Sequence, residues 1–158
     1  MTTKDGYVSE SSLRAGPFDL GYTIEGSGMP LLVIGSAIYY PRTFSRTLRE
    51  KLRLIFVDHR GFAPARTEYS AGDIGFETVL ADIDRLRAHL GLERFAILGH
   101  SGHGYMALEY AKRQAERISH VVMVGTGPSH SARHMALADQ VWEETASPER
   151  KAIFAGNG

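Results

Sequence analysis

The chain has no cysteine and no surplus of charge of either sign. Without cysteine, disulfide bonds and thiolate chemistry are excluded, while the redox compartment is left open. Eighteen basic residues balance eighteen acidic ones, so there is no strong field to attract nucleic acid or an anionic membrane surface. We therefore expect neither a nucleic acid nor a membrane as a partner.

Long apolar runs are also missing. A segment such as Leu31 to Ile34 is far too short to cross a bilayer, and residues 1–6 are too polar to start a signal peptide. What is present is a chain of 158 residues, 43% of them hydrophobic, which is enough for one domain with a sizeable core. We expect a globular, cytoplasmic protein.

Short apolar runs alternate with amphipathic segments along most of the chain. Residues 18–25 alternate apolar and polar side chains, as in a half-exposed antiparallel strand. Four continuous apolar runs have the length of buried strands: 31–34, 54–57, 95–98 and 121–124. The alternation of strands with helices predicts an α/β fold, with a mostly parallel sheet and helices on both of its faces.

Helical spacing is clearest from Phe76 to Leu90, and Gly91 follows as a C-terminal cap. A second helix is expected earlier in the chain, with Phe44, Leu48 and Leu52 on one stripe. After residue 128 the pattern changes to amphipathic helices, the last of them opened by a capping serine and a proline, Ser147-Pro148. We therefore divide the chain into residues 1–128 and 129–158.

The chain is organised around residues 95–110, where a strand pattern changes to a helical one within a few residues. Such a sharp turn needs glycines, and Gly99, Gly102 and Gly104 are placed there. Ser101 stands at the apex, so its hydroxyl is expected to face a cleft. The backbone N–H of Gly102 lies at the predicted helix N-terminus, which favours negative charge.

This segment resembles the nucleophile elbow of the α/β-hydrolase superfamily, G-x-S-x-G, with Gly99 first and Ser101 as the nucleophile. His103 stands at the last position, where the pattern has glycine. The resemblance covers residues 18–128, and the helices beyond resemble the start of a helical cap. It points to serine hydrolases of the esterase or aminopeptidase type.

The resemblance also implies an oxyanion hole. Residues 31–36 are similar to the family's strand that usually ends in His-Gly, although Ile34 replaces that histidine. The backbone N–H groups of Ser36 and Gly102 are the implied donors, converging near the Ser101 hydroxyl. The resemblance implies no cofactor.

The seven histidines offer further candidates. Two pairs have a helical spacing that could suit a metal, His100 with His103 and His130 with His134, but no cysteine or carboxylate cluster accompanies them, so we expect no metal site. A role for His103 or His130 as a replacement base stays open. The remaining three are interpreted as structural: His59, His89 and His120.

A glycine-rich turn between strand and helix could instead bind phosphate. Its glycines follow G-x-x-G-x-G, however, and not the G-x-G-x-x-G of dinucleotide sites, and no P-loop lysine is present. The resemblance therefore favours a serine nucleophile.

Two functions follow from these observations. In the first, a small ester, amide or lactone is hydrolysed through an acyl-Ser101 intermediate. The loop after Val124 carries no carboxylate, so we expect the acid and the base from a C-terminal remainder of the protein or from a second chain, the present sheet being truncated before its last strands. In the second, the chain is a catalytically incomplete binding or interaction module.

Overall fold

The computed structural model describes residues 9–156, which form two compact units divided between Thr126 and Gly127. The polar residues 1–6, for which the sequence predicts no signal peptide, lie outside the described part. No helix within residues 9–156 is long and apolar enough to cross a membrane.

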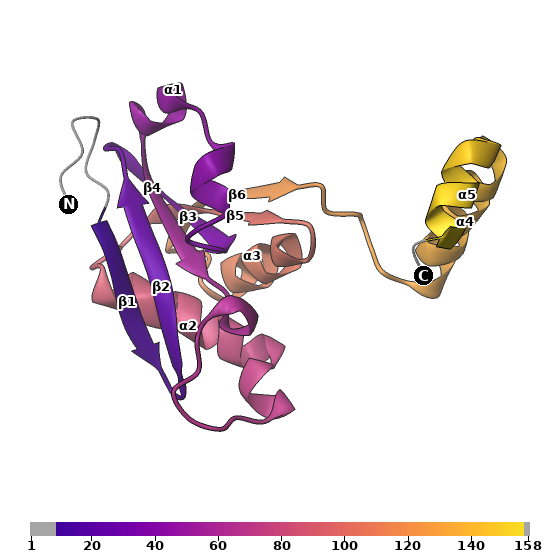
Figure 1. The fold of residues 1–158 in the computed structure, drawn as a ribbon. Helices are drawn as coiled ribbons and strands as arrows, with labels where there is room; N and C mark the ends of the chain where they lie inside the picture. The colour runs from indigo at the N-terminus through magenta and orange to yellow at the C-terminus, as the bar shows by residue number, and fades with distance from the viewer. Residues whose placement is uncertain (1–8, 157–158) are drawn as a thin grey trace. The chain divides into compact units, whose positions relative to one another are not determined.

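The first unit is built on a six-stranded sheet with the strand order β1-β2-β4-β3-β5-β6 (Figure 1). The β1–β2 and β2–β4 pairs are antiparallel, and the β4–β3, β3–β5 and β5–β6 pairs are parallel. The strands are β1 (Ser9–Ala15), β2 (Phe18–Glu25), β3 (Met29–Gly35), β4 (Leu52–Asp58), β5 (Phe95–His100) and β6 (Ile118–Val124). The predicted α/β fold with a mostly parallel sheet is confirmed.

Each apolar run of the sequence lies inside a strand, but β1 is a strand that the sequence pattern does not predict. Its segment is polar except for Leu13 and Ala15, so no strand pattern marks it. A turn at Gly16, with φ of +63°, folds the segment back onto β2, and Ala15 pairs with Phe18. The segment is therefore a strand because it pairs with an apolar neighbour, and not because of its own side chains.

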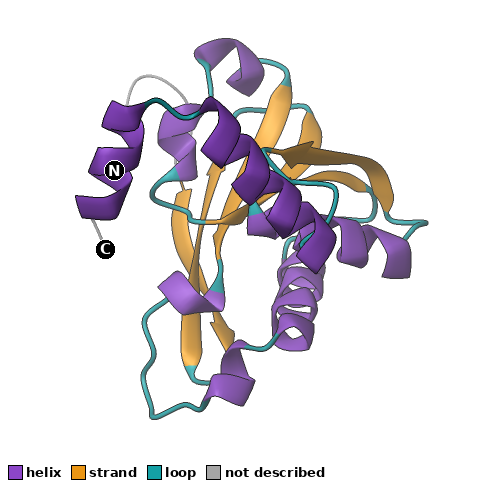
Figure 2. Cartoon of the chain, turned by 90° about the vertical axis from the view of Figure 1, so that its right-hand side faces the viewer, coloured by secondary structure: helices purple, strands orange, loops and turns teal. Residues whose placement is uncertain are grey.

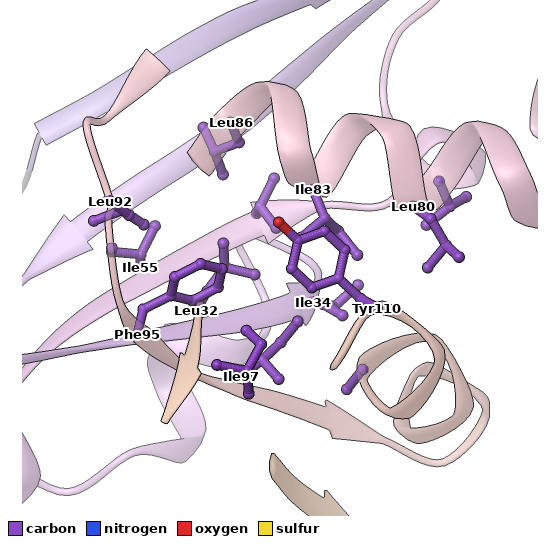
Figure 3. Close-up of a cluster of buried hydrophobic side chains, with 14 of the residues drawn as sticks. Leu32, Ile34, Ile55, Leu80, Ile83, Leu86, Leu92, Phe95, Ile97 and Tyr110 are labelled. Atoms are coloured by element: carbon purple, nitrogen blue, oxygen red, sulfur yellow. The ribbon is translucent and has the colours of Figure 1, made fainter. Parts of the chain in front are cut away.

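One face of the sheet is covered by α2 (Phe76–His89) and α3 (Gly102–Arg113). Tyr110 of α3 packs among aliphatic side chains of α2 and of the central strands (Figure 3). The predicted end of α2 is confirmed, because Gly91 has a φ of +62° and its N–H donates to the Ala88 carbonyl. The cluster's largest fully buried members include Leu32, Ile34, Ile55, Leu86, Phe95, Ile97 and Tyr110.

In the described part of the first unit, the opposite face carries short helical turns, η1 (Tyr40–Thr43) and α1 (Arg46–Arg49). The predicted helix with Phe44, Leu48 and Leu52 on one stripe is therefore wrong. Phe44 packs against Phe56 with ring centroids 5.2 Å apart, Leu48 is exposed, and Leu52 pairs with Met29 at the start of β4. Sheet pairing removes Leu52 from the helix, which is left with a single turn.

Two further 3-10 turns, η2 (Arg60–Phe62) and η3 (Ala71–Ile74), lie between β4 and α2. The Arg60 guanidinium reaches both carboxylate oxygens of Asp82 on α2, and both side chains are buried. This ion pair holds the segment after β4 against α2. The loops at the strand ends can be followed in Figure 2, where they are drawn in teal.

The second unit contains α4 (Ala132–Thr145) and α5 (Pro148–Gly156), both where the sequence predicts a helix. The two helices pack on each other through Trp142 and Phe154, whose ring centroids are 5.4 Å apart. The guanidinium of Arg150 lies over the Trp142 ring, 5.0 Å from its centroid.

Candidate functional site

Ser101 occupies the turn between β5 and α3. Its φ of +55° and ψ of −126° make it the single non-glycine residue with positive φ in the described part of the chain. Residues held in such a conformation cost about 1–3 kcal/mol and concentrate at functional sites. The side chain is exposed and borders a cleft. The predicted placement of Ser101, at an accessible strand-to-helix turn, is confirmed.

The glycines around Ser101 have different reasons to be glycine. A Cβ on Gly99 would overlap the backbone of His103, and a Cβ on Gly104 would overlap the Thr126 side chain. A Cβ on Gly102 would meet nothing within 4 Å. Gly99 and Gly104 therefore permit the close packing of the turn, whereas Gly102 leaves open space beside Ser101.

The turn is fixed to the end of β6. The Ser101 N–H donates to the Val124 carbonyl at 2.9 Å, and the Thr126 hydroxyl donates to the Ser101 carbonyl at 2.9 Å. Ser101 is therefore held by its backbone on both sides, which leaves the hydroxyl as its free polar group.

The cleft beside Ser101 has a volume of about 370 Å³. This lies near the lower end of the range typical of small-molecule sites. Its lining combines the turn with the loops after β3 and β4, as expected where parallel strands end at one edge of a sheet. The lining residues are Tyr40, His59, Gly61, Phe62, His100, Ser101, Gly102, His103 and Met106.

His103 does not open the turn. Its backbone passes close to Gly99, and its imidazole lies beside Gly35 at the end of β3. A Cβ on Gly35 would stand 3.0 Å from the His103 Cε1 and 2.5 Å from the Tyr40 ring. The absence of a side chain at Gly35, whose φ is +139°, therefore makes room for both rings.

The loop after β4 supplies two more rings to the cleft. The His59 ring lies 5.5 Å from the His103 ring and 5.8 Å from that of Phe62, measured between centroids. The interpretation of His59 as a turn residue of structural role is incomplete, because the cleft includes it. Its position directly after a parallel strand, on the same sheet edge as Ser101, is the sequence signal that indicates this location.

His100 also borders the cleft. Its Nδ1 lies 3.3 Å from the Tyr40 hydroxyl, and its ring faces Gly125. Tyr40 thereby connects the segment after β3 to the residue before Ser101. Neither Tyr40 nor Met106 is marked as a site residue by any motif of the sequence.

The loop after β3 contains Ser36, one of the two predicted oxyanion donors. The strand register sets Ile34 opposite Gly99, so Ser36 and Ser101 follow neighbouring strand ends. The Ser36 hydroxyl accepts from the Tyr39 N–H at 3.0 Å. Ser36 is not among the residues that line the cleft, whereas Gly102 is. That both N–H groups serve one oxygen stays a prediction.

Asp58, the last residue of β4, fixes the same loop. Its carboxylate accepts from the Ala37 N–H at 2.7 Å and also bonds the Gly21 backbone. Burial raises the pKa of this carboxyl, against the lowering effect of the two backbone bonds.

Burial also acts on the cleft imidazoles. It lowers the pKa of His59, and the neighbouring His103 lowers it further. Burial likewise lowers the pKa of His103, while a hydrogen bond with the His100 backbone acts in the opposite direction. Both rings therefore favour the neutral form near pH 7. Residues 9–156 contain no cluster of three or more His, Cys, Asp or Glu side chains that could hold a metal ion.

The sequence has relatives among named proteins. It is 50% identical over 137 residues to the AB hydrolase superfamily protein YclE of Bacillus subtilis, a match that spans 87% of this chain and 49% of the relative. It is 37% identical over 93 residues to the proline iminopeptidase PfmaB of Pestalotiopsis fici, spanning 57% of this chain and 32% of the relative. The chain thus spans half or less of the length of these relatives.

Solved structures share the fold. An alpha/beta fold family hydrolase from Bacillus anthracis superposes with a TM-score of 0.62 at 15% identity, over 95% of this chain and 61% of the other. A proline iminopeptidase-related protein from Thermus thermophilus gives 0.61 at 23% identity, over 70% and 42% of the two chains. The family model described as "alpha/beta hydrolase fold" matches residues 28–147. The chain belongs to the α/β-hydrolase fold family.

Proposed function

We propose that this protein is a serine hydrolase that cleaves a small ester, amide or lactone through an acyl-Ser101 intermediate. The observation that carries the proposal is the geometry of Ser101, an exposed hydroxyl on a strained turn at the edge of a cleft. The family alone does not fix the reaction, because a decarboxylase of Shewanella oneidensis is also a relative, 27% identical over 128 residues.

The reaction would proceed in two steps. The Ser101 Oγ attacks the carbonyl carbon of the substrate, its proton passes to a base, and the C=O electrons move to the oxygen. The tetrahedral oxyanion collapses, the leaving group departs with a proton, and acyl-Ser101 remains. Water then gives a proton to the base and attacks the acyl carbon, and the second tetrahedral intermediate releases the carboxylic acid as the base returns the proton to the Ser101 oxygen. We propose the backbone N–H groups of Gly102 and Ser36 as oxyanion donors, because they follow neighbouring strands at one sheet edge.

We propose that the acid and the base come from a C-terminal remainder of the protein or from a second chain. The residues that line the cleft include three imidazoles but no carboxylate to orient one of them. The imidazoles also have other neighbours: His59 Nδ1 accepts from the Gly61 N–H at 2.9 Å. The relatives are longer than this chain, which leaves room for such a segment.

We also propose that the unit containing α4 and α5 is the start of a helical cap. Its helices expose large apolar side chains, among them Val141, Ile153 and Phe154, as a surface that covers a substrate would. A cap of this kind would contribute to the recognition of a small-molecule substrate.

The proposal is tested with a fluorophosphonate probe and a generic nitrophenyl ester. In the complete protein, we expect stoichiometric labelling that is lost in Ser101→Ala and kept in the control Ser12→Ala, on the exposed side of β1. For the 158 residues alone, we expect no ester hydrolysis above background. Labelling that survives in Ser101→Ala would disprove the nucleophile.

Two other results would change the assignment. Fast ester turnover by the 158 residues alone would show that an internal histidine, such as His103 or His130, acts as the base. No labelling and no turnover in the complete protein would favour the second function, a catalytically incomplete binding module, which the lack of a carboxylate in the cleft lining supports.

A further inference from the structure

The inner side of the cleft is closed by His103, where the elbow pattern has glycine. Its ring stands on the bare backbone of Gly35, beside the ring of Tyr40. With glycine at 103, this space over Gly35 would be open to the cleft. The imidazole therefore changes the shape of the cleft next to Ser101, and leaves the turn itself intact.

Two more rings continue the wall formed by His103. His59 and Phe62 lie at centroid distances of 5.5 and 6.4 Å from the His103 ring, with interplanar angles of 63° and 56°. His59 is held by its backbone as well, because its N–H donates to the Gly35 carbonyl at 3.0 Å. Together with Tyr40, which follows β3, the wall is built from three chain segments, and it is fixed to the end of β3.

The cleft lining is poor in ionisable side chains other than histidine. It contains no aspartate, glutamate, lysine or arginine. Arg60, between His59 and Phe62 in the loop, is buried and directed to Asp82, so its charge is neutralised on the side of α2. The lowered pKa values of His59 and His103 keep both imidazoles neutral.

We propose that this cleft is a specificity pocket for an uncharged ring on the substrate, aromatic or alicyclic, and that His103 and Phe62 set the preference. This inference rests on the proposed function of Ser101. Aromatic rings pack favourably on one another at centroid separations of about 4.5–7 Å, and the rings of His59, Phe62 and His103 line the cleft. A charged group there would lose its hydration without meeting an opposite charge.

The test compares matched esters with the complete protein. The first pair, benzyl acetate and butyl acetate, tests a ring on the alcohol side of the ester. The second pair, methyl phenylacetate and methyl hexanoate, tests a ring on the acyl side. In at least one pair, we expect kcat/KM for the ring ester to be higher by about tenfold or more. Monomethyl glutarate, which is anionic, should be cleaved less efficiently than methyl hexanoate by a similar factor.

Substitutions of the wall residues test whether these residues cause the preference for the ring ester. His103→Gly and Phe62→Leu should each lower the ratio of kcat/KM values in the preferred pair, by about fivefold or more. Phe62 is 68% exposed, so its replacement leaves the fold intact even if His103→Gly destabilises it. His134→Ala, an exposed histidine of the second unit, is the matched control and should keep the ratio.

The outcomes separate the two proposals. If fluorophosphonate labels Ser101 but neither pair shows a ring preference, or the preference is unchanged in both variants, the specificity pocket is disproved and the proposed function stands. If Ser101 is not labelled and no ester is cleaved, the proposed function fails, and this inference fails with it.

Discussion

Strand β5 has an apolar neighbour on each side, β3 and β6, and the two neighbours differ in burial. In β3, Leu32 and Val33 are fully buried, because β4 pairs on the far side and side chains cover both faces. In β6, Val122 and Val124 remain 37% and 47% exposed, although the strand pairs with β5 along its length.

This difference shows that an apolar strand is not by itself a buried strand. A strand is buried only when another strand pairs with each of its two edges and side chains cover both faces of the sheet. Within residues 9–156, β6 is an edge strand that pairs with β5 alone. Long apolar edges are a liability that proteins usually cover.

The largest effect is expected from shortening a side chain in each strand. Leu32→Ala should lower the free energy of unfolding by about 3 kcal/mol, because it leaves a cavity in a fully packed cluster. Val122→Ala should cost less than about 1 kcal/mol in the 158-residue chain, because its side chain is already partly in water. Urea denaturation of both variants measures the difference.

The same two substitutions can contradict the difference in burial between β3 and β6. If Val122→Ala costs as much as Leu32→Ala in the 158-residue chain, β6 is covered in solution and the contrast fails. If the proposed C-terminal segment exists and covers β6, Val122→Ala should cost more in the presence of that segment than in the 158-residue chain.

A second contrast lies inside the elbow, at the end of β5. Gly99→Ala should destabilise the protein by about 2 kcal/mol, because the new Cβ overlaps the His103 backbone, which cannot move away as a side chain could. Gly102→Ala should be neutral or slightly stabilising, since its Cβ meets nothing and alanine favours the helix. Thermal unfolding of the two variants gives the comparison, and equal melting temperatures would contradict it.

A smaller loss of stability is expected from removing the contact between the elbow and Thr126, which follows β6. Thr126→Val removes the hydrogen bond from the Thr126 hydroxyl to the Ser101 carbonyl and should cost about 1 kcal/mol. Thr126→Ser, which keeps the hydroxyl, is the control and should recover most of this loss in urea denaturation. A loss in Thr126→Ser as large as that in Thr126→Val would contradict the assignment of the effect to this hydrogen bond, because serine keeps the hydroxyl.

The smallest effect is expected in the pH dependence of stability. Burial lowers the pKa of His59 and His103 below the ordinary 6.5, and the charges facing them are His100, Arg60 and Asp82. The unfolded chain therefore binds more protons than the folded one just below pH 6.5, so stability falls as the pH drops through 6.5 toward the folded-state pKa values. Below those values no further loss arises from these groups.

Melting temperatures at pH 7.5 and 5.5 measure this fall. It should be smaller in the double variant His59→Gln with His103→Gln, because glutamine does not titrate. His120→Gln, on the exposed strand β6, is the matched control. A fall of the same size in the double variant would show that other groups cause it.

The sequence predicted the part of the site that is local. Gly99 to Gly104 lie between a strand pattern and a helix pattern, and the turn places Ser101 at its apex in the structure. The sequence did not predict that the wall of the cleft comes from Tyr40, His59 and Phe62, which are separated from Ser101 by some forty to sixty positions. Nothing in local periodicity encodes a contact between loops that meet only when their strands pair.

By itself, the sequence determined the central strands, the helix from Phe76 and the elbow, because each depends on side-chain periodicity or on glycine within a few residues. Only the tertiary structure decided the rest. Pairing with β2 made a strand of the polar segment before Ala15, and pairing with β3 drew Leu52 out of a predicted helix. The free energy of these ladders and of the covered faces depends on distant neighbours, and it outweighs local propensity where the two disagree.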